Sequence, residues 1–245
     1  MVHQTPDFQQ PPEGLRTSNE DAVVFVDLQN LNNFLSSCCD VNPHRLHIVN
    51  FVKEWLAPHG IGVADVRIYT GVPDETIDPV RAEAVRKRIG WLHASGAKVF
   101  THKLAYTRDA ATGEQRGREK GIDVRLASEL VAAVAVGNVR RVVVVSQDRD
   151  IVQGLDVARN ICQFKGEYLH AYSPVLKDLS RVSHQRCAYW GIPLTNKIEV
   201  PLALVDHYCS TNNTHSLQGD PAPAQLDAKP TLDTPPVQRK RFSPA

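Results

Sequence analysis

The sequence lacks the features that mark secreted, membrane-spanning and dinucleotide-binding proteins. Its first 20 residues have no apolar core of a signal peptide, and no run approaches the length of a membrane span. The glycines at 113 and 117 lie in a polar stretch rather than between a strand and a helix, so no dinucleotide fingerprint is present. We therefore expect a soluble cytoplasmic protein with no membrane partner.

Cysteine is sparse, and its pattern argues against a disulfide framework or a zinc site. The five cysteines include no C-x-x-C pair, and their odd number and scattered positions favour reduced thiols in a cytosolic protein. The ten histidines include no H-x-x-x-H pair of the kind that binds zinc from one helix. The cysteines are Cys38, Cys39, Cys162, Cys187 and Cys209.

Net charge is almost absent as well, at +1 over 245 residues, so no global field indicates a nucleic-acid or membrane partner. Any basic binding surface must be local. Hydrophobic residues make up 42% of the chain, enough for one sizeable core with tails. We predict a disordered leader at 1–20, one domain at 21–200 and a disordered tail at 205–245, whose ends are candidates for recruiting a protein partner or a second copy of the chain.

Short apolar runs alternate with amphipathic segments along the predicted domain. Val142 to Val145 form a run of β-branched residues that is too short for a helix and is typical of a strand buried on both faces. Residues 22–26 repeat this design. We predict an α/β fold, a Rossmann-like three-layer sandwich with a mostly parallel central sheet of four or five strands. The other expected strands are 63–70, 96–104 and 168–172, the expected helices are 44–57, 78–94, 122–136, 151–160 and 175–190, and 107–119 is expected to be a loop.

Carboxylates stand at the points where the predicted strands end. Asp27 follows the first strand, Asp148 and Asp150 follow the valine run, and Asp123 lies in the first turn of a predicted helix. In open α/β sheets, ligands bind at the carboxyl ends of the strands. Each of these acids could instead cap a helix or a turn, and Asp123 could simply complement the helix dipole.

Four carboxylates gathered at one edge repel one another unless they bind cations or have raised pKa values. Divalent ions with oxygen ligands, Mg²⁺ or Mn²⁺, are the natural partners of such a cluster. A metal held there can activate water and stabilise displacement at a phosphodiester. The four acids are therefore candidate metal ligands and catalytic residues.

Three motifs in this order resemble those of the NYN domain, a branch of the PIN-like nuclease superfamily. They are Val26-Asp-Leu-Gln-Asn30, Lys120-Gly-Ile-Asp123-Val and Val145-Ser-Gln-Asp-Arg-Asp150, and the resemblance covers about residues 22–175. It implies a metal-dependent ribonuclease whose substrate is RNA, with Asp27, Asp123, Asp148 and Asp150 holding Mg²⁺ or Mn²⁺. Asn30 would then orient or hydrogen-bond near the metal or the substrate.

Further substrate contacts are expected beside the acids. Lys120 and Ser146 are candidates for contacting phosphate, although an exposed loop lysine and a turn serine are equally good descriptions of them. Arg116 and Arg118 are candidates for gripping the RNA backbone, since phosphate contacts come chiefly from Arg and Lys. The basic helix at 78–94 is either a further RNA-facing surface or a solvated face.

The sequence departs from the NYN pattern at Gln147, which replaces a glycine, and at Arg149, which replaces a small residue. The charge of Arg149 can neutralise part of the acidic cluster, contact phosphate or weaken metal binding. An alternative function is therefore a non-catalytic RNA-binding or regulatory module that keeps the fold. A third, a phosphatase with an aspartate nucleophile, rests on the D-x-D of Asp148 and Asp150, and a small-molecule phosphoester assay would test it.

Overall fold

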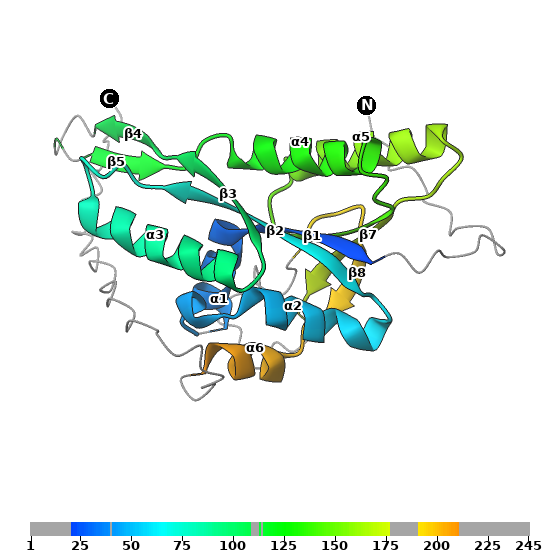
Figure 1. Ribbon diagram of the computed structural model, residues 1–245, viewed down its shortest axis with the longest axis horizontal. Coiled ribbons are helices and arrows are strands. Elements are labelled where there is room, and N and C mark those ends of the chain that lie inside the picture. The colour runs from blue at the N-terminus through cyan, green and yellow to red at the C-terminus, as the bar shows by residue number, and fades with distance from the viewer. Residues whose placement is uncertain (1–20, 40, 109–112, 114, 177–190, 211–245) are drawn as a thin grey trace, which may run out of the picture.

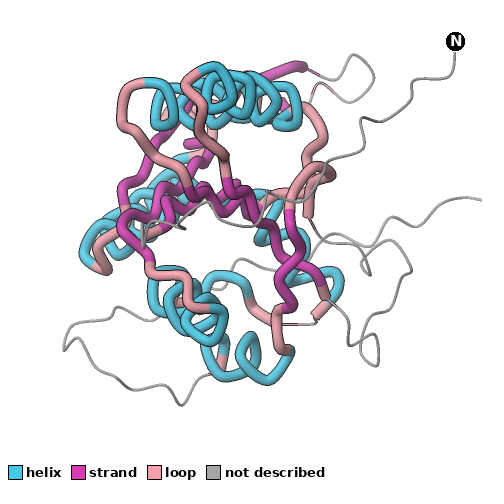
Figure 2. The backbone as a smooth tube through the Cα atoms, turned by 90° about the vertical axis from the view of Figure 1, so that its right-hand side faces the viewer, coloured by secondary structure: helices cyan, strands magenta, loops and turns pink. Residues whose placement is uncertain are grey.

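The computed structural model describes residues 21–39, 41–108, 113, 115–176 and 191–210, without the side chains of Cys38 and Arg116. A six-stranded sheet in the order β3-β2-β1-β6-β7-β8 runs through the middle of the molecule, and every neighbouring pair in it is parallel. Helices cover both faces of this sheet (Figures 1 and 2). The predicted α/β fold, a Rossmann-like sandwich around a parallel sheet, is confirmed.

The two central strands are the two apolar runs that the sequence shows most clearly. All six residues of β1 and the four valines of β6 are buried, as expected where helices cover both faces of a parallel sheet. The strands of the sheet are β1 (Ala22–Asp27), β2 (Val63–Val72), β3 (Lys98–Lys103), β6 (Arg141–Val145), β7 (His170–Val175) and β8 (Asn196–Glu199).

Alternating side chains of β1 supply two separate cores. Val24 and Val26 pack with the layer of α1, α2, α3 and α6, whereas Val23 and Phe25 pack with the layer of α4 and α5. Figure 2 shows one layer on each side of the strands. The helices are α1 (Leu28–Cys38), α2 (Ile48–Leu56), α3 (Pro79–Ala94), α4 (Ile122–Ala135), α5 (Ile151–Phe164) and α6 (Leu202–Cys209), with short 3₁₀ turns η1 (Pro43–Arg45) and η2 (Ala57–His59) beside α2.

The predicted loop at 107–119 was wrong in part, because residues 107–108 and 115–118 belong to the strands of an antiparallel hairpin. Its strands are β4 (Ala105–Arg108) and β5 (Gln115–Arg118), and Tyr106 lies opposite Gly117. This hairpin has no apolar alternation for a sequence reading to detect. The hydroxyl of Tyr106 accepts a hydrogen bond of 3.0 Å from the backbone N–H of Asp74, which ties the hairpin to the loop after β2.

The central sheet has six strands, whereas four or five were expected. Strand β8 was missed because it is short and only Ile198 among its four residues is buried. Helix α6 was not predicted either, although Leu202, Val205 and Cys209 pack in the core beside α2. The helix expected at 175–190 falls almost wholly on 177–190, which lie outside the described residues, and Val175 belongs to β7.

Both edge strands of the sheet carry exposed polar and charged side chains. On β3, residues 101–103 and Lys98 are exposed, and on β8 the only buried residue is Ile198. Lys197 of β8 donates a hydrogen bond of 2.7 Å to the hydroxyl of Ser173 on β7.

Within the described part of the chain, no helix has both the length and the apolar character that a bilayer crossing requires. Three of the cysteines, Cys39, Cys162 and Cys209, are described, and each is buried with a free thiol. Burial raises the pKa of Cys39 to about 12, so this thiol stays protonated and unreactive.

Candidate metal centre

The centre of the sheet brings the ends of β1 and β6 side by side. Val26 is paired with Val145 in the parallel register, so Asp27 and Ser146 emerge next to each other at the carboxyl edge. Helix α1 starts directly after β1, α5 starts after the turn that follows β6, and α4 starts at the same edge beyond the hairpin (Figure 1). The topology therefore gathers residues that are more than 100 positions apart in the sequence.

Asp27 is buried, with 4% of its surface exposed, and its carboxylate is held by protein donors. It accepts hydrogen bonds from the backbone N–H of Asn30 at 3.0 Å and from the Asn30 side-chain amide, so it is the N-cap of α1. Desolvation by burial raises the pKa of Asp27, the bonds from Asn30 and Ser146 lower it, and the charge of Asp148 raises it further. Asp27 is therefore the N-cap of α1, and it lies at the same edge of the sheet as the predicted metal ligands.

Ser146 joins Asp27 to the second acidic segment. Its hydroxyl donates to a carboxylate oxygen of Asp27 at 3.3 Å and accepts a bond of 3.0 Å from the backbone N–H of Asp148. The residue is fully buried. Ser146 is therefore placed to orient Asp27 and Asp148, and it presents no exposed atom to a phosphate.

Asp123, Asp148 and Asp150 form an acidic triad whose ligand oxygens lie within 4.8 Å of one another. Asp123 and Asp148 are half-buried and Asp150 is exposed. Three carboxylate oxygens at this spacing fit a hard divalent cation such as Mg²⁺ or Mn²⁺, which takes oxygen ligands. Asp27 belongs to the same edge but is not part of this triad.

The local structure leaves the triad carboxylates available. Asp150 occupies the N-cap position of α5, yet its side chain makes no capping hydrogen bond. Asp148 accepts a turn bond of 2.9 Å from the backbone N–H of Asp150, and no other bond to its carboxylate comes from the described residues. Asp123 lies in the first turn of α4, which follows Gly121 in the left-handed conformation at φ +83°. A residue with a Cβ is strained there, which accounts for the glycine of the K-G-x-D motif.

The sequence analysis missed a fifth acid, Glu119. Its carboxylate accepts a bond of 2.6 Å from the backbone N–H of Gly71, and with the Gln29 amide turned to donate, Nε2 of Gln29 lies 2.6 Å from its other oxygen. Burial raises the pKa of Glu119, the Gly71 bond lowers it, and the charge of Asp27 raises it. Glu119 thereby links the end of β2, the start of α1 and the segment before α4. Glu119 lies in a polar stretch of the sequence. Its position next to Lys120 was the one feature that could have indicated a role at the site.

Three of the cations that the sequence predicts as phosphate contacts are exposed. Lys120, Arg149 and Arg118 are exposed, and Arg149 stands on the turn between Asp148 and Asp150. Arg116 lies on β5, but its side chain is outside the described part of the structure. Arg81, at the start of α3, lowers the pKa of Glu119 through its positive charge.

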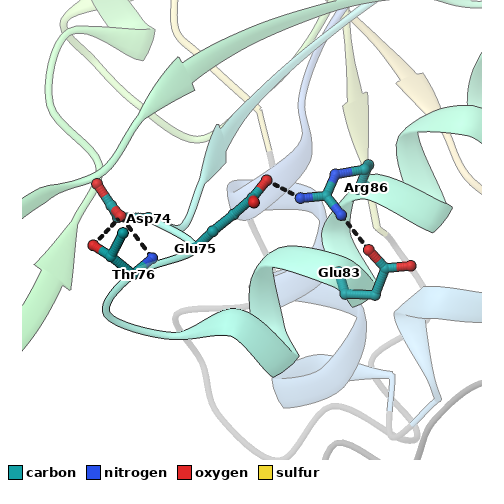
Figure 3. Close-up of polar contacts among 5 residues, drawn as sticks. All are labelled: Asp74, Glu75, Thr76, Glu83 and Arg86. Atoms are coloured by element: carbon teal, nitrogen blue, oxygen red, sulfur yellow. Dashed lines mark hydrogen bonds and ion pairs between the residues drawn. The ribbon is translucent and has the colours of Figure 1, made fainter.

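The remaining cations of α3 are engaged by the protein itself. Arg86 is paired with both Glu75 and Glu83, as Figure 3 shows, and Lys87 lies 3.6 Å from Glu83. Arg88 donates to the backbone oxygen of Pro43 at 2.9 Å and packs against η1. These contacts favour the interpretation that the charged side of α3 is an ordinary solvent-exposed face and not an RNA-binding surface. Arg81 is the exception.

Neither a family model nor a curated protein matches this sequence. The fold and the site define the class on their own: an α/β protein with a parallel central sheet and a clustered acidic triad at the carboxyl edge of that sheet.

Proposed function

We propose that this chain is a metal-dependent ribonuclease of the NYN type that hydrolyses RNA phosphodiesters at the acidic triad. The observation that carries the proposal is the convergence of Asp123, Asp148 and Asp150 within 4.8 Å, beside the buried carboxylate of Asp27. The three NYN-like motifs supply all four of these residues, and the fold is an α/β fold of the kind that the resemblance implies.

The protein's own groups have distinct parts in this proposal. The triad carboxylates would hold Mg²⁺ or Mn²⁺, and the hydrogen bonds from Asn30 and Ser146 hold Asp27 at a fixed orientation beside them. When bound, the ion supplies an activated water and neutralises charge that develops on the phosphate. Lys120, Arg149 and Arg118, which are exposed, would contact neighbouring phosphates.

The test is cleavage of a fluorescent single-stranded RNA, with Mn²⁺, with Mg²⁺ and with EDTA, by the wild type and by Asp148→Asn. Asp156→Asn is the matched control, because Asp156 is an exposed aspartate of α5 outside the triad. We expect metal-dependent cleavage by the wild type and by Asp156→Asn, and none by Asp148→Asn. Equal cleavage by all three proteins would assign the activity to a contaminant.

One observation favours the second candidate, a non-catalytic RNA-binding module. Arg149 is exposed on the turn between two acids of the triad, where a positive charge competes with a bound cation. This function predicts RNA binding that weakens with salt and no cleavage at any metal concentration. Reverting Arg149 to a small residue would then be expected to increase metal affinity.

A further inference from the structure

The acidic triad lies at one end of a groove between α4 and α5. The groove has a volume of about 650 Å³, within the usual range for a small-ligand site. Both helices begin at the carboxyl edge of the sheet, so Asp123 and Asp150 stand at its mouth. Beyond them it is lined by Val124, Ala127, Ser128, Val131, Gln153 and Gly154.

The floor of the groove is formed by a close contact between the two helices. A Cβ at position 154 would lie 2.8 Å from the Cβ of Ala127, so only glycine permits this approach. Small residues at this contact leave an open groove along the surface of the two helices, and Val124, with 63% of its surface exposed, forms part of an apolar wall. A flat apolar group can lie against this wall.

The side chains that line the groove indicate which kind of ligand it can bind. The side chains that line it include two carboxylates at the mouth and no cation, which disfavours a phosphate inside the groove. Ser128 and Gln153 supply uncharged donors and acceptors at its rim. An apolar wall with a few neutral hydrogen-bonding groups is the environment in which proteins hold an unstacked base.

We infer that the α4–α5 groove binds a nucleobase of the RNA, from a nucleotide next to the phosphate held at the triad. This inference rests on the proposed function for the identity of the ligand. The observation behind this inference is that the groove is continuous with the triad. A phosphate bound at the mouth of the groove would have its neighbouring base only one sugar away from the groove. The base contacts Val124 and Val131, and the Gln153 amide hydrogen-bonds its edge.

The test compares a short RNA with a ribose-phosphate chain of the same length that has no bases, by fluorescence anisotropy in Ca²⁺, with RNA integrity checked on a gel. Ser128→Phe fills the groove from its rim, and Val136→Phe adds the same ring at an exposed position outside it. We expect the wild type and Val136→Phe to prefer the base-bearing chain by about tenfold or more, and Ser128→Phe to lose most of that preference.

A second pair of variants keeps the test decisive if Ser128→Phe does not fold. Gln153→Ala should reduce the preference for bases about threefold, whereas Asn160→Ala, an exposed amide of α5 outside the groove, should leave it unchanged. A preference for bases that is unaltered in Ser128→Phe and Gln153→Ala would overturn the inference. So would a wild-type dimer that Ser128→Phe converts to a monomer, because the occupant would then be a second copy.

The experiments distinguish the absence of base binding in the groove from the absence of ribonuclease activity. If the wild type does not cleave RNA in Mg²⁺ or Mn²⁺ but shows the groove-dependent preference for bases, the binding site stands without the hydrolase. If it cleaves RNA but the preference is independent of the groove, the hydrolase stands and the base site does not.

Discussion

The carboxylates at the end of the sheet fall into two groups that differ in what already binds them. Asp27 and Glu119 each accept hydrogen bonds from the protein and are desolvated, whereas Asp123 and Asp148 are half-buried and Asp150 is exposed, with few partners among the described residues. The basic side chains also fall into two groups. Arg86 is paired with two glutamates, whereas Arg118 is exposed and has no ion-pair partner among the described residues. Charges engaged within the fold serve structure, and the others are available to a ligand.

The largest expected effect comes from removing one carboxylate of the triad. Asp123→Asn should lower Mn²⁺ affinity and RNA cleavage by at least about 100-fold, because the ion loses a charged ligand. Isothermal titration with Mn²⁺ and an RNA cleavage assay measure the two losses separately. Asp156→Asn should leave both unchanged, and an equal loss in that control would mean that the effect is one of net charge.

Asp27→Asn should reduce cleavage by about 10- to 100-fold, because Asp27 orients groups beside the triad, while making the metal-free protein more stable. Burial raises the pKa of Asp27 above its unfolded value of 3.8, so the folded protein binds this proton more tightly than the unfolded chain does. The contribution of Asp27 to the free energy of unfolding therefore falls as the pH rises from 3.8 through the folded pKa. Asparagine cannot ionise there, so the advantage of Asp27→Asn should increase with pH.

Thermal melts of both proteins in EDTA between pH 5 and pH 8 measure this difference. Saturating Mn²⁺ should reverse the order at neutral pH, because an ion that binds only the folded state stabilises the wild type. A difference that is constant across the pH range would show that Asp27 is not desolvated as described.

Replacing Glu119 by Ala should cost about 1 to 3 kcal/mol of stability, because the buried N–H of Gly71 loses its acceptor. Glu119→Gln retains an acceptor oxygen and should cost much less. Glu83→Ala, on the surface of α3, is the control and should change stability by less than about 1 kcal/mol. Urea melts give the three values, and equal costs for Ala and Gln would contradict the bridging role of Glu119.

The smallest effect is expected at the cations. Arg118→Ala and Lys120→Ala should each reduce the salt dependence of RNA binding by about 0.7 in the log–log slope, the value for one phosphate contact on a single strand. Arg86→Ala should leave that slope unchanged because Arg86 is paired with Glu75 and Glu83. The same slope for all three variants would mean that engagement within the fold does not separate ligand-binding cations from structural ones.

The central sheet could be predicted from the sequence because its strands are unbroken apolar runs. The clearest examples are β1 and the four valines of β6. The sequence also predicted that Asp148 and Asp150 lie at the carboxyl edge of the sheet, since they follow a buried parallel strand. Asp123 follows no such strand, and it was predicted to join them because it opens a helix that packs on the same sheet.

Strand β8 was missed because it is short, largely exposed and paired with the more distant β7. The hairpin β4–β5 was missed because its two short strands are polar and have no apolar alternation. Glu119 was missed for the related reason that its partners, Gly71 and Gln29, come close only in the folded chain.

The two outermost strands of the sheet determine how this protein behaves towards copies of itself at high concentration. An edge strand presents unpaired backbone groups onto which another chain can add. Here β3 carries Lys98 and Lys103, and β8 carries Lys197 and Glu199, so a strand that approaches either edge must desolvate charge. The same six-stranded sheet that gathers the acids at its centre is thus protected at its margins against edge-to-edge aggregation.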